Sequence, residues 1–326
     1  MMLSVKVEFH IHVDWGSKSY TKGTVKSNDS NHDEVMILDQ AKKEIIRLEA
    51  TKSHSTIENY RTALRSFAQY LDRDIPSDEL SAELIGGYER WLHNRNVCPN
   101  TISCYMRSLR SIVGNICGDA ALKYFKTVFT GRSKTDKRAI KQQDLIRLRN
   151  IPLKKGSFLS LARDLFLFSF YALGMPFVDM AFLRKEHIHG NQIIYHRHKT
   201  GQRICVPLEP CMKRIIRRYQ RPNCDYIFPI VHSEAPSVAY KEYLTKLNNY
   251  NRTLKVLATM AGIGCNLTSY VSRHTWASTA YSNNVELPVI SKGLGHVNPQ
   301  NTLIYIKEIN DSRLFEANHR LIRLIE

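Results

Sequence analysis

A polar, basic segment over residues 130–138 separates two long stretches of helical sequence in this chain. It reads Thr-Gly-Arg-Ser-Lys-Thr-Asp-Lys-Arg, and with almost no apolar side chain it predicts an exposed linker. A chain of 326 residues is also long for a single hydrophobic core, because cores tend to split above about 250–300 residues. We therefore expect two domains. The composition of the linker is equally consistent with binding along a phosphate backbone and with a solvent-exposed connector. Its basic residues are Arg132, Lys134, Lys137 and Arg138.

The first half predicts a helical domain over residues 36–129, preceded by a β-like appendage over residues 1–35. In the appendage, apolar residues alternate with polar ones from Val5 to Val13, which is the period of a half-buried strand. The domain begins with helical sequence near Val35. A helix follows from a capping box at Ser55 and Glu58, and a third is capped by Asn100. Apolar residues at helical spacing predict the buried faces: Tyr60, Ala63, Leu64, Phe67, Leu71, Leu84, Tyr88, Trp91, Leu92, Ile102, Tyr105, Met106, Leu109, Ile112 and Val113.

The second half, residues 139–326, predicts a larger helical domain with a small sheet. A very apolar helix is expected over residues 158–173, and two strands over 192–195 and 203–207 are joined by a turn that contains glycine. The other helical stretches are 142–149, 209–220, 237–261, 268–282, 287–293 and 301–307. The expected fold is mainly α with a small β-sheet.

The charge balance points to a polyanionic partner. Lys and Arg number 47 against 30 Asp and Glu, which leaves a net charge of +17. Nucleic acid is the expected partner, with an anionic membrane surface or an uninvolved basic surface as the alternatives. The longest apolar stretch, near Leu165 to Met175, is far shorter than the roughly 20 residues of a membrane helix, and the start has no signal-peptide layout. We expect a cytoplasmic protein. Seven cysteines without a C-x-x-C pair predict reduced, buried thiols.

Three short motifs near the C-terminus carry the chemistry. They are Thr268-Ser-Tyr-Val-Ser-Arg-His-Thr-Trp-Ala277, Lys292-Gly-Leu-Gly-His296 and Asn301-Thr-Leu-Ile-Tyr305. Together they resemble the signature of the tyrosine recombinase, or phage integrase, family: an H-x-x-R box, then L-G-H, and a tyrosine nine residues later. The resemblance covers roughly residues 36–320, although its specific motifs lie in the second half.

Cleavage of a phosphodiester without metal or water needs a nucleophile, a charge clamp and an acid for the departing oxygen. The resemblance implies that Tyr305 attacks to form a 3′-phosphotyrosyl bond and that the guanidinium of Arg273 binds nonbridging oxygens. It implies that His296 donates to the same phosphate or assists proton transfer. Lys199, on the turn between the two strands, is then the candidate acid. The family fold is a C-shaped DNA clamp, in which a helical core-binding (SAM-like) domain is linked to the catalytic domain.

The sequence departs from the family pattern at two positions. The first arginine box, T-G-x-R-x-x-E, reads Leu173-Gly-Met-Pro-Phe-Val-Asp179, so Pro176 stands where the arginine is usual. Asp179 keeps the acidic position and is expected to orient a basic or backbone group. Arg184 is a candidate substitute for the arginine, or an ordinary surface residue. Tyr270 occupies the usual histidine position of H-x-x-R; its hydroxyl can donate to a phosphate oxygen but is no base near neutral pH. His274 is read as structural.

The resemblance also implies partners and leaves alternatives. We expect double-stranded DNA, a homotetramer in the synapse, a monomer or weak dimer off DNA, accessory DNA-bending factors, and a place at the nucleoid. The apolar tail from Ile304 to Leu324 is a candidate subunit contact or folds on its own domain. A noncatalytic DNA-binding protein and a type IB topoisomerase-like enzyme are the competing functions. Further candidate DNA-binding residues lie outside the apolar faces of the predicted helices, namely Arg61, Arg65, Arg107 and Arg110, and on the predicted hairpin, namely Arg197.

Histidines cluster around the predicted strands, in His187-Ile-His189 and His196-Arg-His198. Such spacing points two imidazoles to one face and suggests a metal, but no cysteine or paired carboxylate completes a tetrahedral set. We interpret these residues as DNA contacts or as solvated hairpin residues. No P-loop, dinucleotide-binding glycine motif or H-E-x-x-H occurs, so the sequence predicts neither a metal nor a cofactor.

Overall fold

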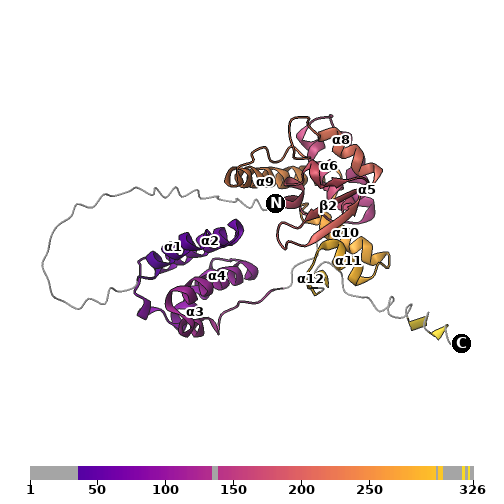
Figure 1. The fold of residues 1–326 in the computed structure, drawn as a ribbon. Coiled ribbons are helices and arrows are strands. Elements are labelled where there is room, and N and C mark those ends of the chain that lie inside the picture. The colour runs from indigo at the N-terminus through magenta and orange to yellow at the C-terminus, as the bar shows by residue number, and fades with distance from the viewer. Residues whose placement is uncertain (1–35, 134–138, 299, 304–317, 320–321, 324–326) are drawn as a thin grey trace, which may run out of the picture. The chain divides into compact units, whose positions relative to one another are not determined.

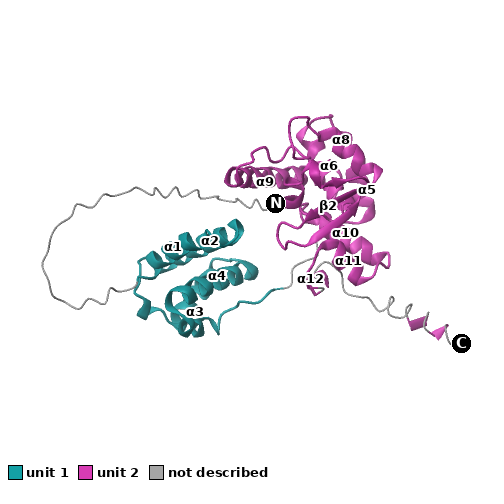
Figure 2. Ribbon diagram, in the orientation of Figure 1, with its two compact units in different colours: residues 1–134 teal, residues 135–326 magenta. Residues whose placement is uncertain are grey.

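A computed structural model describes residues 36–133, 139–298, 300–303, 318–319 and 322–323 (Figure 1). The chain divides into two compact units, residues 1–134 and residues 135–326 (Figure 2). The strand expected over Val5 to Val13 lies outside the described residues.

The described part of the first unit is a set of helices around one apolar core. Its elements are α1 (Ile37–Leu48), α2 (His54–Leu71), α3 (Ala82–Asn94) and α4 (Pro99–Cys117), with the 3-10 segments η1 (Ser77–Glu79) and η2 (Asp119–Phe125) (Figure 1). Tyr88 of α3 is fully buried, with its ring 5.1 Å from that of Phe67 in α2 and its hydroxyl donating to Ser66 Oγ at 2.8 Å. The buried faces follow the predicted spacing, and among the predicted residues Leu71, Leu84, Trp91 and Tyr105 are only partly buried.

The capping box predicted for α2 is wrong. The helix begins at His54, and Ser53 is its N-cap, with Oγ accepting from the backbone N–H of Thr56 at 3.4 Å. Ser55 and Glu58, the two residues of the predicted box, therefore lie inside the first turns. The serine cluster offers several N-cap candidates, and the sequence does not distinguish them.

The cap predicted for α4 is also wrong. Cys98 is the N-cap, and Pro99 occupies the first turn, where its missing N–H costs no hydrogen bond. The side chain of Asn100 instead accepts from the backbone N–H of Ser133 at 2.9 Å and donates to the carbonyl of the same residue at 3.1 Å. Asn100 thus attaches the chain that leaves the helical unit back onto α4.

The described part of the second unit packs helices around one long apolar helix. Its elements are α5 (Gln142–Asn150), α6 (Phe158–Tyr171), α7 (Phe177–Ala181), η3 (Lys185–His187), β1 (Ile188–His189), β2 (Gln192–His196), β3 (Arg203–Pro207), α8 (Pro210–Tyr219), α9 (Pro236–Met260), α10 (Val271–Ser282), α11 (Leu287–Leu294) and α12 (Gln300–Leu303) (Figure 1). In α6, Phe166 and Phe168 are fully buried, and the Phe168 ring lies 4.8 Å from that of Phe228. Among the described helices, none combines the length and the apolarity that a bilayer crossing requires.

The sheet has three antiparallel strands in the order β1, β2, β3. Ile193 and Tyr195 of β2 are buried together with Ile204 and Val206 of β3, while the residues between them are less buried, which is the expected period of two. The sequence predicted β2 and β3. It missed β1, because two residues are too short to show a pattern.

The prediction of buried cysteines is wrong. All seven thiols are free, but Cys98, Cys205 and Cys265 are exposed and the other four are partly buried. Each exposed thiol sits where the local fold ends or faces outward: at the N-cap of α4, on the outer side of β3, and beyond α9.

Candidate active site

Arg273 lies in the first turn of α10 and is almost entirely buried, with 2 % of its surface exposed. Its Nη1 donates to the carbonyl of Gly174 at 2.9 Å, and its Nη2 donates to the carbonyl of Leu294 at 2.6 Å. A buried guanidinium is costly unless its donors are engaged, so these two carbonyls stabilise its position.

Gly174 is required by the close approach of Arg273. Its φ is +71°, in the left-handed region, and a Cβ there would lie 3.1 Å from both Cα and Cγ of Arg273. The glycine of the first box therefore positions the arginine of the second box, through its carbonyl and through its missing side chain.

His296 follows α11 directly after Gly295, which ends the helix in the left-handed conformation. The imidazole Nε2 lies 3.2 Å from Nη2 of Arg273, and Nδ1 lies 2.9 Å from Oγ1 of Thr302, the buried threonine of α12. Partial burial, together with the positive charges of Arg273, Arg197 and Lys199, lowers the pKa of His296 to about 4. His296 is therefore neutral at pH 7 in the absence of DNA.

The hairpin between β2 and β3 is attached to the same region through Asp179 of α7. The carboxylate accepts from the backbone N–H of His198 at 2.9 Å and forms an ion pair with Arg197, whose Nε lies 2.7 Å from Oδ2. Burial raises the pKa of Asp179, and the charge of Arg197 opposes that rise. Asp179 thus holds the two residues that precede Lys199, which is itself exposed at the turn.

Arg197 was predicted as a DNA-binding residue, and that role stays a prediction, but its side chain lies in the interior of the unit and not on the surface of the hairpin. Its side chain is only 6 % exposed, and Nη1 donates to the carbonyl of Leu294. It lies inside the unit, beside Arg273, because the carboxylate of Asp179 and this carbonyl draw it inward.

The first-box position and its candidate substitute are also described. Pro176 is buried and is the N-cap of α7, so it brings no side-chain donor to the site. Arg184 pairs with Glu234, donates to the Tyr226 hydroxyl at 3.1 Å and lies over the Tyr226 ring at 4.7 Å. Those contacts engage the guanidinium of Arg184 with Glu234 and Tyr226, and neither residue contacts Arg273.

Tyr270 lies at the N-cap of α10, immediately before the helix that carries Arg273. Its side chain is 46 % exposed, and its ring lies 6.0 Å from that of His274. The hydroxyl is thus open to a ligand. Tyr305, the predicted nucleophile, lies outside the described residues, as does the tail segment 304–317. The last described part of α12 ends at Leu303.

The candidate DNA-binding residues of the first unit differ in how they are engaged. Arg61 forms ion pairs with Glu49 and Glu58, whereas Arg65, Arg107, Arg110 and Arg132 are exposed without a carboxylate partner among the described residues. Lys134, Lys137 and Arg138 lie outside the described residues.

The histidine tracts form no metal centre in the part of the chain that the structure describes, where no group of three or more His, Cys, Asp or Glu could hold an ion. His187 accepts from the backbone N–H of Arg184 through Nδ1 at 3.0 Å. His198 stacks on Phe182, with ring centroids 5.2 Å apart and planes 7° apart. Both imidazoles thus have structural contacts.

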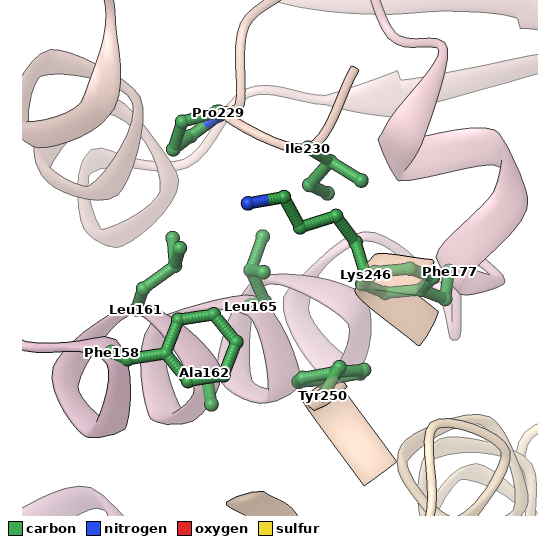
Figure 3. A pocket seen from close by; sticks show the side chains of 9 residues that line it. All are labelled: Phe158, Leu161, Ala162, Leu165, Phe177, Pro229, Ile230, Lys246 and Tyr250. Carbon is green, nitrogen blue, oxygen red and sulfur yellow. The ribbon is translucent and has the colours of Figure 1, made fainter. Parts of the chain in front are cut away.

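A pocket elsewhere in the second unit shares no residue with the site (Figure 3). Phe158, Leu161 and Leu165 of α6 form one side, and the amine of Lys246 reaches across the opening (Figure 3). Tyr250, at its base, is fully buried against Phe177 with ring centroids 4.6 Å apart. The pocket is thus lined mainly by apolar side chains, with Lys246 as its one charged residue.

Sequence reasoning missed two residues of the site, Arg197 as an interior group and Thr302 as a partner of His296. No local signal identifies Arg197, because its partners are far away in sequence. Thr302 had a weak signal, since it stands between the L-G-H motif and the tyrosine.

Two family models match the chain. The phage integrase SAM-like domain matches residues 36–115, and the phage integrase family matches residues 139–311. Among curated proteins, the tyrosine recombinase XerD of Oceanobacillus iheyensis is 22 % identical over 269 residues, which cover 80 % of this chain and 90 % of the relative.

Solved structures share the fold at low identity. A lambda integrase tetramer bound to a Holliday junction is 12 % identical with a TM-score of 0.65, covering 85 % of this chain and 78 % of that one. The integrase of the Tn1549 transposon in complex with transposon right end DNA is 12 % identical with a TM-score of 0.64, covering 88 % and 100 %. These likenesses show the fold, which is mainly helical with a small sheet, as expected.

Proposed function

Because the chain belongs to the phage integrase family, whose model matches more than half of its residues, we propose that it is a site-specific DNA recombinase that breaks and rejoins strands through a tyrosine. Integration, excision and inversion are the reactions that such an enzyme performs on a mobile element. The curated relatives that match the chain are tyrosine recombinases as well.

One observation carries this function: Arg273 and His296, separated by 23 positions, meet at 3.2 Å. A phosphodiester that enters there would meet a fixed guanidinium and an imidazole. The hairpin with Lys199 is fastened beside them through Asp179. Arg273, His296 and the hairpin that carries Lys199 are thus neighbours in space, and Tyr305 lies outside the described residues.

The reaction follows from these groups. The phenolic oxygen of Tyr305 gives its proton to His296 or to water and attacks the phosphorus, the bond from phosphorus to the 5′-oxygen breaks, and a 3′-phosphotyrosyl bond forms. Lys199 gives its proton to the departing 5′-oxygen, which leaves as a hydroxyl. Because the new ester keeps the energy of the old one, a 5′-hydroxyl from another strand reverses the step without ATP. Arg273 neutralises the nonbridging oxygens during both steps.

Three further residues support this chemistry in the proposal. Neutral His296 takes part in proton transfer from Tyr305 or turns to the phosphate when the charge of DNA arrives. The Tyr270 hydroxyl donates to a nonbridging oxygen, since its side chain is exposed three residues before Arg273 in the sequence. Asp179 is a positioning residue, because it acts through Arg197 and the backbone of His198.

The proposed partner is double-stranded DNA, and the proposed synapse is a homotetramer, as in the lambda integrase tetramer bound to a Holliday junction. A net charge of +17 supports phosphate binding. We assign residues 36–129 to core binding, 130–138 to the linker and 139–326 to catalysis. The exposed arginines Arg65, Arg107, Arg110 and Arg132 contact the DNA backbone in this proposal, and the protein works at the nucleoid, where its substrate lies.

The test is a covalent-complex assay. Wild type and Tyr305→Phe are incubated with a supercoiled plasmid that carries the chromosomal DNA flanking the gene, and the reaction is quenched with SDS. We expect protein linked to the 3′ end of DNA in wild type only. If both proteins bind the DNA equally with steep salt dependence and neither forms the adduct, the chain is a DNA-binding protein rather than a recombinase. Adducts on any sequence, without synapsis, would identify a topoisomerase-like enzyme.

A further inference from the structure

The sequence motifs identify one arginine in the candidate active site, Arg273, but a DNA phosphate carries two nonbridging oxygens. In attack by Tyr305 these oxygens gain negative charge, and fixed donors at that point typically lower the barrier by several kcal/mol. The family pattern places a second arginine at position 176, where this chain has a buried proline. A further guanidinium must come from another element if the charge is to be neutralised as fully.

Arg197 reaches the required place from the β2–β3 hairpin. Its Nη1 donates to the carbonyl oxygen of Leu294, and Nη2 of Arg273 donates to the same oxygen at 2.6 Å. Two guanidinium groups that bond one oxygen lie within a few ångströms of each other. Both are also close enough to His296 to lower the pKa of its imidazole.

A second cation beside a buried arginine is unfavourable unless something offsets it. Here the carboxylate of Asp179 forms an ion pair with Arg197 at 2.7 Å, and it also interacts electrostatically with Arg273. One anion therefore serves two cations, and the cluster of Asp179, Arg197 and Arg273 keeps a net positive charge. A dianionic phosphate group in attack is the natural complement of that excess.

The main chain is shaped to admit both arginines. A Cβ at Gly174 would lie 3.1 Å from Cγ of Arg273, and a Cβ at Gly295 would lie 3.1 Å from Cγ of Arg197. Both glycines have positive φ, +71° and +63°. The glycine of the first box accommodates one arginine, and the glycine of the L-G-H motif accommodates the other.

We propose that Arg197 is the second phosphate-binding arginine of this enzyme and takes over the role of the arginine that Pro176 replaces. This inference rests on the proposed recombinase function. A guanidinium carries five N–H donors, more than the oxygens of Asp179 and Leu294 engage, so Arg197 keeps donors for a nonbridging oxygen. Lys199, the proposed acid, follows Arg197 by two residues on the same hairpin.

The experiment compares two charges at the scissile phosphate. The cleaved position is first mapped from the wild-type adduct, and an oligonucleotide duplex is then made with a methylphosphonate there, which removes one nonbridging oxygen and the negative charge. Adduct formation is measured on both duplexes for wild type, Arg197→Ala, Arg197→Lys and Arg184→Ala. Arg184→Ala is the matched control, because that arginine pairs with Glu234 outside the site.

We expect Arg197→Ala to lose about 100-fold or more in adduct rate on the phosphodiester. On the methylphosphonate the loss falls below about 10-fold, since no charge remains to be neutralised. Arg197→Lys keeps the charge but not the forked donors of a guanidinium, so its adduct rate on the phosphodiester lies between those of wild type and Arg197→Ala. Arg184→Ala has the adduct rate of wild type on both duplexes. DNA affinity stays within about threefold throughout, because one buried contact adds little to a whole phosphate interface.

Equal losses on the two duplexes would mean that Arg197 only supports the fold, and no loss on either would mean that it has no role; both results overturn the inference. If Arg197→Ala is unfolded, the double variant Arg197→Ala with Asp179→Asn is compared in the same way, because it leaves no unpaired carboxylate. Absence of any wild-type adduct would overturn the recombinase function itself, which separates the two failures.

Discussion

Nε2 of His296 accepts a hydrogen bond from Nη2 of Arg273 at 3.2 Å. A guanidinium can only donate, so Nε2 is unprotonated and the neutral imidazole carries its proton on Nδ1, which donates to Oγ1 of Thr302 at 2.9 Å. The DNA-free site therefore holds a neutral imidazole whose Nε2 is already engaged by the guanidinium, and its lowered pKa makes it a weak base.

The pH dependence of stability follows from His296. Its folded pKa, about 4, is below the model value of 6.5, so the unfolded chain binds the proton more readily. The stabilisation from this residue is complete above about pH 6.5 and is lost as the pH falls toward 4. We expect wild type to lose more unfolding free energy between pH 7.5 and pH 5 than His296→Gln, as measured by urea denaturation. Parallel losses in the two proteins would contradict this assignment.

Loss of the Tyr270 hydroxyl tests its proposed contact with phosphate. Because the side chain is 46 % exposed, Tyr270→Phe should leave the thermal midpoint within about 2 °C of wild type. The adduct rate should fall roughly 10-fold, since one phosphate donor is removed, and Tyr270→His, which restores a donor, should recover it. An unchanged rate in Tyr270→Phe would exclude the contact.

Asp179 should be essential for the hairpin. Asp179→Ala leaves Arg197 as a buried charge without its carboxylate and removes the acceptor for His198 N–H, so it should cost about 3–5 kcal/mol of unfolding free energy. Asp179→Asn keeps an oxygen for His198 and should cost less. Chemical denaturation of both variants measures the difference. Equal costs would show that the hydrogen bond to His198 contributes nothing.

Gly295→Ala combines backbone strain with a steric clash, because the new Cβ would meet Cδ1 of Ile204 at 2.7 Å and Cγ of Arg197 at 3.1 Å. Gly190→Ala is the matched control, with a similar φ of +58° and no atom within 4 Å. The control should cost about 1 kcal/mol from strain alone, and Gly295→Ala about 2–4 kcal/mol. The prediction is wrong if the two variants unfold at the same denaturant concentration.

The arginines of the first unit should contribute unequally to DNA binding. Arg65 and Arg110 are exposed without a described carboxylate partner, and Arg61 is held by Glu49 and Glu58. Arg65→Ala and Arg110→Ala should each lower the slope of log affinity against log salt by about 1. Arg61→Ala should change it less. Salt titrations of DNA binding by fluorescence anisotropy test the order, and an Arg61 effect as large as the others would refute it.

The sequence predicted the helices and the site motifs because both depend on local order. The period of the apolar residues identifies the buried face of α2. The spacing between the motifs predicts that Arg273 and His296 belong to one site. The start of α2 was predicted wrongly, since Ser53 and Ser55 both suit an N-cap and the structure uses Ser53.

Arg197 shows why the rest could not be predicted. In the sequence it is one basic residue in a histidine-rich hairpin, and the surface is the ordinary place for arginine. Its position depends on a carboxylate in α7 and on a carbonyl 97 residues away in α11. Such pairings arise only when the helices and the sheet have packed. The same limit applies to Arg184, whose partner Glu234 lies 50 residues away.

The carbonyl oxygen of Leu294 receives both arginines, and it belongs to the main chain. No codon change removes it, since every residue at position 294 supplies the same atom. An arginine can therefore be lost from one element and gained on another without any change at the point where the two must meet. Substitutions at position 294 therefore leave this backbone acceptor in place, and the arginines that bond to it can change position in the sequence during evolution.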